Sequence, residues 1–160
     1  MRHHTTEFRS RAVRALVILH EREMHRFYAT WRDAHRASIA LPDTPDPNYA
    51  SLETLLGHVL GAARGYVVWM TARLELPDPG IEPAPESAAI VEQAESYLEH
   101  LLERWPDALR DVPDDRLEDV TYPVWGVEYS IDAMLEHAVM HPMRHAFQLE
   151  ELMEQQRGLA

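Results

Sequence analysis

The segment 130–153 carries three histidines, His137, His141 and His145, spaced four residues apart. In a helix, positions four apart lie about 40° apart around the axis, so the three side chains would share one face. Two imidazoles at this spacing can bind one metal ion, whereas the outer pair is separated by roughly 12 Å of helix rise. A metal site here therefore uses one adjacent pair, either 137/141 or 141/145, and needs a third ligand from another helix.

A histidine suited to be that third ligand lies early in a second predicted helix, 51–76. Ser51 is a favourable N-cap, and Glu53 places a negative charge in the positively polarised first turn. His58 follows two turns later, next to Gly61–Ala62, where small side chains would let another helix approach closely. Histidine donors without cysteine favour zinc, nickel, iron or copper over magnesium or calcium.

Two more helices are expected before the histidine-rich one. An apolar stripe that alternates steps of four and three residues predicts a helix from about Thr6 to Arg36. The stripe consists of Val13, Val17, His20, Met24, Phe27 and Trp31. Another helix begins near Ser87, and Pro106 should kink or end it because proline offers no N–H to the preceding turn.

The remaining segments are expected to connect these helices. Prolines forbid a regular helix in 41–50 and 77–85, and 114–129 is a longer excursion in which 120–125 is expected to be extended chain. The histidine-rich helix is capped by Ser130 and should end just before Gly158. The pattern predicts an all-α protein, a four-helix bundle with long connections, forming a single domain over residues 1–160.

Pro142, next to His141, is expected to bend the histidine-rich helix. That bend either wraps the helix around the core or aims His141 and His145 at a common point. His20 is interpreted as a structural core histidine, and His25, His35 and His100 as surface groups. His3 and His4 are poor candidates because they lie near the terminus.

Composition excludes several classes of function. The chain has no cysteine, and its 15 basic residues are all arginine, so thiolate ligands, Schiff-base chemistry and a P-loop lysine are absent. The formal net charge of −12 argues against nucleic acid or an anionic membrane as partner. No apolar run approaches the roughly 18–20 residues of a membrane span, and no signal-peptide pattern is evident, so we expect a cytoplasmic protein.

Other known metal and catalytic motifs do not fit. No histidine has a glutamate three residues before it, as a ferritin-like di-metal bundle requires. His20-Glu21 is followed by histidine at position 25 rather than 24, so the zincin motif fails as well. Nucleophile-elbow and glycine-rich phosphate-loop motifs are also absent from the sequence.

Two segments together resemble the DinB-like (YfiT-like) superfamily of metal-dependent enzymes. They are Ser51-Leu-Glu-Thr-Leu-Leu-Gly-His58 and His137-Ala-Val-Met-His141-Pro-Met-Arg-His145-Ala-Phe-Gln148. The resemblance implies a four-helix bundle of up-down-down-up topology, with one divalent ion held by His58, His141 and His145. It further implies that His137 supports the site from outside the ligand set or is structural.

This chain departs from the family's common ending His-Arg-Gly-Gln, because Ala146 and Phe147 replace the arginine and glycine. Phe147 is expected to narrow the space that the glycine would leave. Gln148 is retained and is expected to donate a hydrogen bond near the site, with Trp125 or Tyr129 near its mouth. The resemblance also makes a homodimer the expected assembly.

The leading functional hypothesis is an enzyme that uses one zinc or nickel ion on a small-molecule substrate. Three neutral ligands would leave a coordination position open, where the ion can activate water or a thiol. Relatives in the superfamily include thiol-dependent isomerases and transferases, so a low-molecular-weight thiol is a second expected cofactor; with water as nucleophile the enzyme would be a hydrolase. The alternative is a non-catalytic metal-binding or structural helical-bundle dimer.

Overall fold

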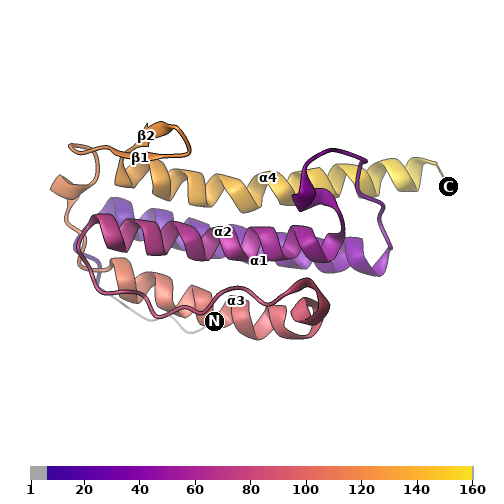
Figure 1. The fold of residues 1–160 in the computed structure, drawn as a ribbon, viewed down its shortest axis with the longest axis horizontal. Coiled ribbons are helices and arrows are strands. Elements are labelled where there is room, and N and C mark those ends of the chain that lie inside the picture. The colour runs from indigo at the N-terminus through magenta and orange to yellow at the C-terminus, as the bar shows by residue number, and fades with distance from the viewer. Residues whose placement is uncertain (1–6, 160) are drawn as a thin grey trace.

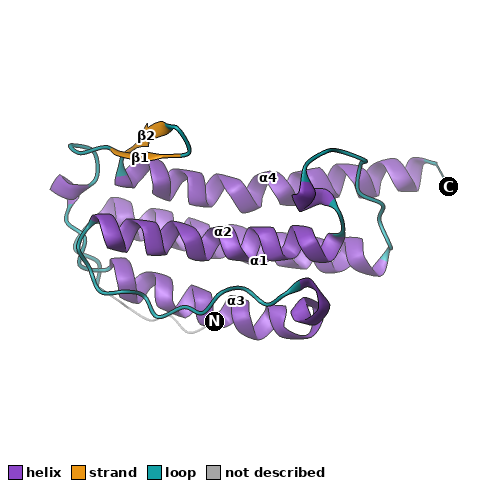
Figure 2. Ribbon diagram, in the orientation of Figure 1, coloured by secondary structure: helices purple, strands orange, loops and turns teal. Residues whose placement is uncertain are grey.

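The computed structural model describes residues 7–159 and confirms the all-α expectation (Figure 1). Its four long helices are α1 (Arg11–Arg36), α2 (Leu52–Arg73), α3 (Ser87–Leu109) and α4 (Ile131–Gly158). Two short 3-10 helices, η1 (Pro47–Tyr49) and η2 (Asp114–Arg116), and one small hairpin lie in the connections (Figure 2). Within the described residues, no helix combines the length and the apolar character needed to cross a membrane.

The first helix shows how the apolar stripe determines burial. Ser10 caps α1, since its Oγ accepts a hydrogen bond from the Val13 N–H at 3.2 Å. The helix therefore begins at Arg11, and the expected start at Thr6 lies outside the described residues, as do His3 and His4. All six residues of the predicted stripe are buried, which confirms that this face of α1 points into the core.

The helices pack as two closely associated pairs, α1 with α4 and α2 with α3, and α2 also contacts α4. Between α1 and α3, the His20 ring stacks on Trp105 with their centroids 3.7 Å apart. Between α1 and α2, the Trp31 Nε1–H donates to the carbonyl of Leu52 at 2.7 Å. The candidate metal site requires the direct packing of α2 against α4.

The proline-rich segment 74–86 runs along the length of the bundle before α3 begins, so α2 and α3 both start at the end where α1 finishes (Figure 1). Two hydrogen bonds fasten it. The Arg64 Nε–H donates to the carbonyl of Ile81 at 2.6 Å, and the Tyr97 hydroxyl donates to the carbonyl of Glu82 at 2.8 Å. The expected absence of a regular helix in 77–85 is confirmed.

The excursion before α4 contains an antiparallel hairpin that the sequence reading missed. Strands β1 (Tyr122–Val124) and β2 (Val127–Tyr129) are joined by the two-residue loop Trp125–Gly126. Both loop residues have positive φ, 52° and 76°, as a type I′ turn requires. Extended chain was expected over 120–125, and this is correct for the residues of β1. The turn was not predicted because its first loop position holds tryptophan, whereas type I′ turns favour asparagine, aspartate or glycine there.

Both internal prolines are tolerated. The structure continues α3 through Pro106 to Leu109, so Pro106 does not end the helix. Trp105 and Leu109 on either side are fully buried, and their packing outweighs the one backbone hydrogen bond that proline removes. Likewise α4 continues through Pro142 and includes Gly158, which was expected to lie just beyond the end. The end of α2 also differs from the prediction, because this helix ends at Arg73 rather than at residue 76.

Candidate metal centre

Helices α2 and α4 bring together His58, His141 and His145. One ligand nitrogen from each residue lies within 4.8 Å of the other two, so the group can hold a metal ion. His58 Nε2 is 3.0 Å from His141 Nε2. The i, i+4 pair that faces α2 is therefore 141/145, and the other pair that spacing allowed, 137/141, does not form this cluster.

The three rings are oriented for convergence of nitrogen atoms rather than for stacking. Their centroids lie 4.7–5.5 Å apart and their planes cross at 70–89°. Tetrahedral zinc with Zn–N bonds of about 2.0–2.1 Å needs ligand nitrogens roughly 3.3 Å apart. His58 Nε2 and His141 Nε2 are 3.0 Å apart and all three nitrogens lie within 4.8 Å of one another, so the donor set fits one divalent ion.

Two ring nitrogens in the cluster are buried without any hydrogen-bond partner among the described residues, His145 Nε2 and His141 Nδ1. Such an orphaned group costs free energy in a protein interior. A metal ion explains the His145 nitrogen, because coordination would use the lone pair that no hydrogen bond satisfies. The nitrogen donors of the cluster and their burial without hydrogen-bond partners thus both indicate a bound metal ion.

Gln148 fixes the tautomer of His145. The His145 Nδ1–H donates to Gln148 Oε1 at 2.9 Å, which leaves the lone pair on Nε2 facing the cluster. The Tyr49 hydroxyl donates to the same oxygen at 2.8 Å and lies 3.3 Å from His145 Nδ1. The expectation that Gln148 acts as a donor was wrong, because its carbonyl oxygen accepts both bonds.

Tyr49 was missed because it lies in η1, within a proline-rich connection that has no periodic pattern. The η1 turn is capped by the Asp46 side chain, which accepts a hydrogen bond from the Asn48 N–H at 2.9 Å. This turn places the Tyr49 phenol against α4, where its hydroxyl contacts Gln148 and His145. The residue is found from tertiary structure alone.

Burial keeps the three histidines neutral. Desolvation, followed by the charges of neighbouring histidines, lowers the pKa of His141 to about 2. Desolvation also lowers the pKa of His145 to about 4 and, with less burial, shifts the pKa of His58 downward. Neutral imidazoles are the form that binds metal, so the ligands need no proton release at neutral pH.

A cavity of about 750 Å³ opens onto the cluster and is lined by His58 and His141. Tyr66, Trp69 and Trp125 contribute aromatic walls, and Gly61 and Ala62 form part of the α2 side. Such a volume is typical of small-molecule sites. The side chains of two candidate ligands, His58 and His141, thus border a space that a bound molecule could occupy.

The small residues of α2 do not serve the role that was expected of them. A Cβ added at Gly61 would meet only the Ala84 side chain, 4.0 Å away, so no helix packs closely there. The close approach occurs one turn earlier, where a Cβ on Gly57 would come within 3.3 Å of Ile90 in α3. The face that includes Gly61–Ala62 instead leaves room for the cavity.

His137 lies on the cavity wall, one turn before His141. Its ring centroid is 5.2 Å from both Tyr66 and Trp125 and 6.1 Å from His141. Within the described chain no hydrogen bond joins His137 to the three clustered histidines. It therefore contacts the site through ring packing and faces the same space as a bound molecule would.

Three other expectations concern the surroundings. Trp125 lines the cavity, whereas Tyr129 does not line it but packs against Trp125, with ring centroids 5.6 Å apart. Phe147 does not narrow the site, because its side chain is 56% exposed and is not among the residues that line the cavity. His20 is fully buried against Trp105 between α1 and α3, away from the cluster, in keeping with its interpretation as a core residue.

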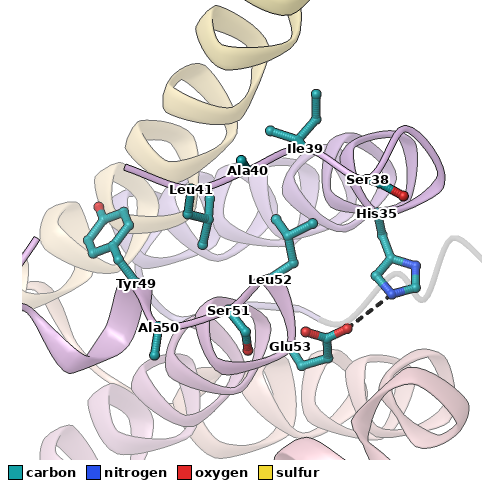
Figure 3. A pocket seen from close by; sticks show the side chains of 10 residues that line it. All are labelled: His35, Ser38, Ile39, Ala40, Leu41, Tyr49, Ala50, Ser51, Leu52 and Glu53. Carbon is teal, nitrogen blue, oxygen red and sulfur yellow. Dashed lines mark hydrogen bonds and ion pairs between the residues drawn. The ribbon is translucent and has the colours of Figure 1, made fainter. Parts of the chain in front are cut away.

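A second, smaller pocket of about 390 Å³ lies where α1 ends and α2 begins (Figure 3). His35 Nε2 lies 3.1 Å from a Glu53 carboxylate oxygen at one end, and Tyr49 lies at the other. Among the described residues, those that line this pocket include no group of three side chains able to hold a metal ion. It is separate from the cavity that opens onto His58.

Comparisons with protein-family models, with curated proteins and with solved structures found no match to this chain.

Proposed function

We propose that this protein is a metal-dependent enzyme of the DinB-like type, in which His58, His141 and His145 hold one zinc or nickel ion. The observation that carries the proposal is the convergence of three neutral imidazoles, two of which line a cavity large enough for a small molecule. The helix order supports it, because α2 and α3 begin at the same end of the bundle, as an up-down-down-up arrangement requires.

Such an ion would keep its full positive charge and an open coordination position, and would lower the pKa of a water or thiol placed there. The chain's own residues supply the remaining functions. Gln148 and Tyr49 orient His145, and Phe27 covers its ring from α1 at a centroid distance of 6.5 Å. Tyr66, Trp69 and Trp125 give the cavity aromatic walls.

The chain contains no cysteine, so any thiol nucleophile must come from a small-molecule cofactor. We propose either a thiol-dependent S-transferase or isomerase, or a hydrolase that uses water in the same position. His137 is the histidine on the cavity wall outside the ligand set, and it is placed to exchange a proton with a molecule bound there.

Metal analysis tests the proposal. Protein purified without a metal-affinity tag, stripped with a chelator and dialysed against zinc or nickel at pH 7.5, should retain about one ion per chain. Retention below about 0.2 ion per chain would contradict it. A turnover screen of the loaded protein, with and without low-molecular-weight thiols, then separates transferase from hydrolase, and one ion without turnover would favour the non-catalytic alternative.

A further inference from the structure

The cavity is lined by one acidic and one basic side chain, and only the acidic one has a hydrogen-bond partner among the described residues. Two charged side chains line it, Asp46 and Arg144. The Asp46 carboxylate is occupied as the cap of η1. Arg144 forms no ion pair with any residue of the described chain, although acidic residues outnumber basic ones 27 to 15 in the sequence. An unpaired guanidinium at the cavity wall is therefore available to a bound anion.

The position of Arg144 relative to the site supports this role. It precedes His145 in α4 and lines the same cavity as His58 and His141. Its positive charge acts on the cavity interior, since after burial it is the next contribution that lowers the pKa of His137. A cation at this location attracts anions into a protein that otherwise repels them.

The aromatic walls define the other part of the ligand. Trp125 is 61% exposed at the tip of the hairpin, and its ring stands across from Tyr66 at a centroid distance of 6.1 Å and an angle of 83°. The exposed part of the indole is available to pack against a flat apolar group. Trp69 extends the aromatic surface along α2. Aromatic surfaces of this kind favour flat ligands.

We infer that the substrate is an aromatic or similarly flat carboxylate, whose carboxylate pairs with Arg144 and whose flat part packs against Trp125. This inference rests on the proposed function for the identity of the reacting centre. The guanidinium offers two parallel N–H donors, a geometry that matches a carboxylate. His58 and His141, which line the same cavity, would then contact the atoms next to the flat group.

Binding of a simple probe pair tests the inference. The probes are 3-phenylpropanoate and its neutral isostere 3-phenylpropanamide, titrated by calorimetry into zinc-loaded and metal-free protein. We expect the acid to bind about tenfold more tightly than the amide. Arg144→Gln should abolish that preference without weakening the amide, and Arg144→Lys should retain only part of it.

Arg157→Gln is the matched control, because it removes the same charge from an exposed position near the end of α4. Trp125→Asn tests the flat part and should weaken acid and amide alike by about tenfold. Asparagine tolerates positive φ, and Asn-Gly is a favoured type I′ loop, so this variant should keep the hairpin.

Three results would overturn the inference: equal binding of acid and amide, an equal effect of the two glutamine variants, or tighter binding of phenyl phosphate than of the acid. A preference that depends on zinc but not on Arg144 would also overturn it, since the carboxylate would then bind the metal. Loss of zinc binding with the Arg144-dependent preference intact would contradict the proposed function alone.

Discussion

His58 Nε2 lies 3.0 Å from His141 Nε2, although the two residues are separated by 83 positions in the chain. The contact exists because α2 and α4 pack side by side with both histidines on the facing sides. The contact also distinguishes His141 from His137, which have equivalent spacing in the sequence. His141 faces His58, whereas His137, one turn away, faces the aromatic wall of the cavity.

Substitution of these two histidines should have opposite effects on metal binding. His141→Ala removes a central nitrogen donor, so we expect zinc affinity to fall by at least a hundredfold. His137→Ala should retain one ion per chain with affinity within about threefold of the wild type. Competition with a chromophoric chelator measures both. Equal losses in the two variants, with unchanged circular dichroism, would show that the ion is held elsewhere.

Gln148→Ala should weaken zinc binding without removing a ligand. Its Oε1 accepts the His145 Nδ1–H at 2.9 Å, and loss of such a supporting hydrogen bond typically costs about 10–100-fold in metal affinity. Tyr49→Phe removes only the second bond to that oxygen and should cost less. Gln155→Ala, on an exposed part of the same helix, is the control. An affinity unchanged by Gln148→Ala would mean that His145 is oriented by packing alone.

Metal loading should stabilise the folded protein. An ion that binds only the folded state at a thousand times its dissociation constant adds about 4 kcal/mol, which corresponds to roughly 10 °C in melting temperature for a chain of this size. Differential scanning calorimetry with and without zinc measures the shift, and a chelator should reverse it. The His141→Ala variant should show little shift. A similar rise in that variant would indicate binding at another site.

The parts of this structure that depend on helical periodicity were predictable from the sequence. Burial of Phe27 and Trp31 follows from the stripe of α1, and the shared face of His141 and His145 follows from their spacing. Periodicity could not choose between the two adjacent histidine pairs. That choice depends on the rotation of α4 against α2, which packing along both helices determines.

The parts that the sequence concealed depend on tertiary contacts of irregular segments. Tyr49 bonds Gln148 because the short η1 turn places it against α4. Trp125 was expected near the site, but the hairpin that places its ring against His137 was not. Neither segment has a repeating pattern that could be read. Pro106 was expected to kink or end α3, and the sequence could not decide between these because the burial of its neighbours, which lets the helix continue, is a tertiary property.

His20 should make the metal-free protein sensitive to acid. Burial lowers the pKa of His20 from 6.5 to about 3, and both ring nitrogens lack partners among the described residues. Below pH 6.5 the unfolded chain binds a proton at this position that the folded protein cannot bind until about pH 3. Stability attributable to neutral His20 is therefore complete above pH 6.5 and is lost as the pH falls, at about 1.4 kcal/mol per pH unit.

His20→Phe should remove this dependence while keeping a ring stacked on Trp105. Relative to the wild type, the variant should gain about 2 kcal/mol of unfolding free energy between pH 7.5 and pH 5, because the shift accumulates over about 1.5 units below 6.5. Urea denaturation in the presence of a chelator measures this, since the clustered histidines then titrate alike in both proteins. The control is His25→Phe, at an exposed position of the same helix. Parallel pH profiles for wild type and His20→Phe would show that His20 is protonated in the folded protein or that water satisfies its nitrogens.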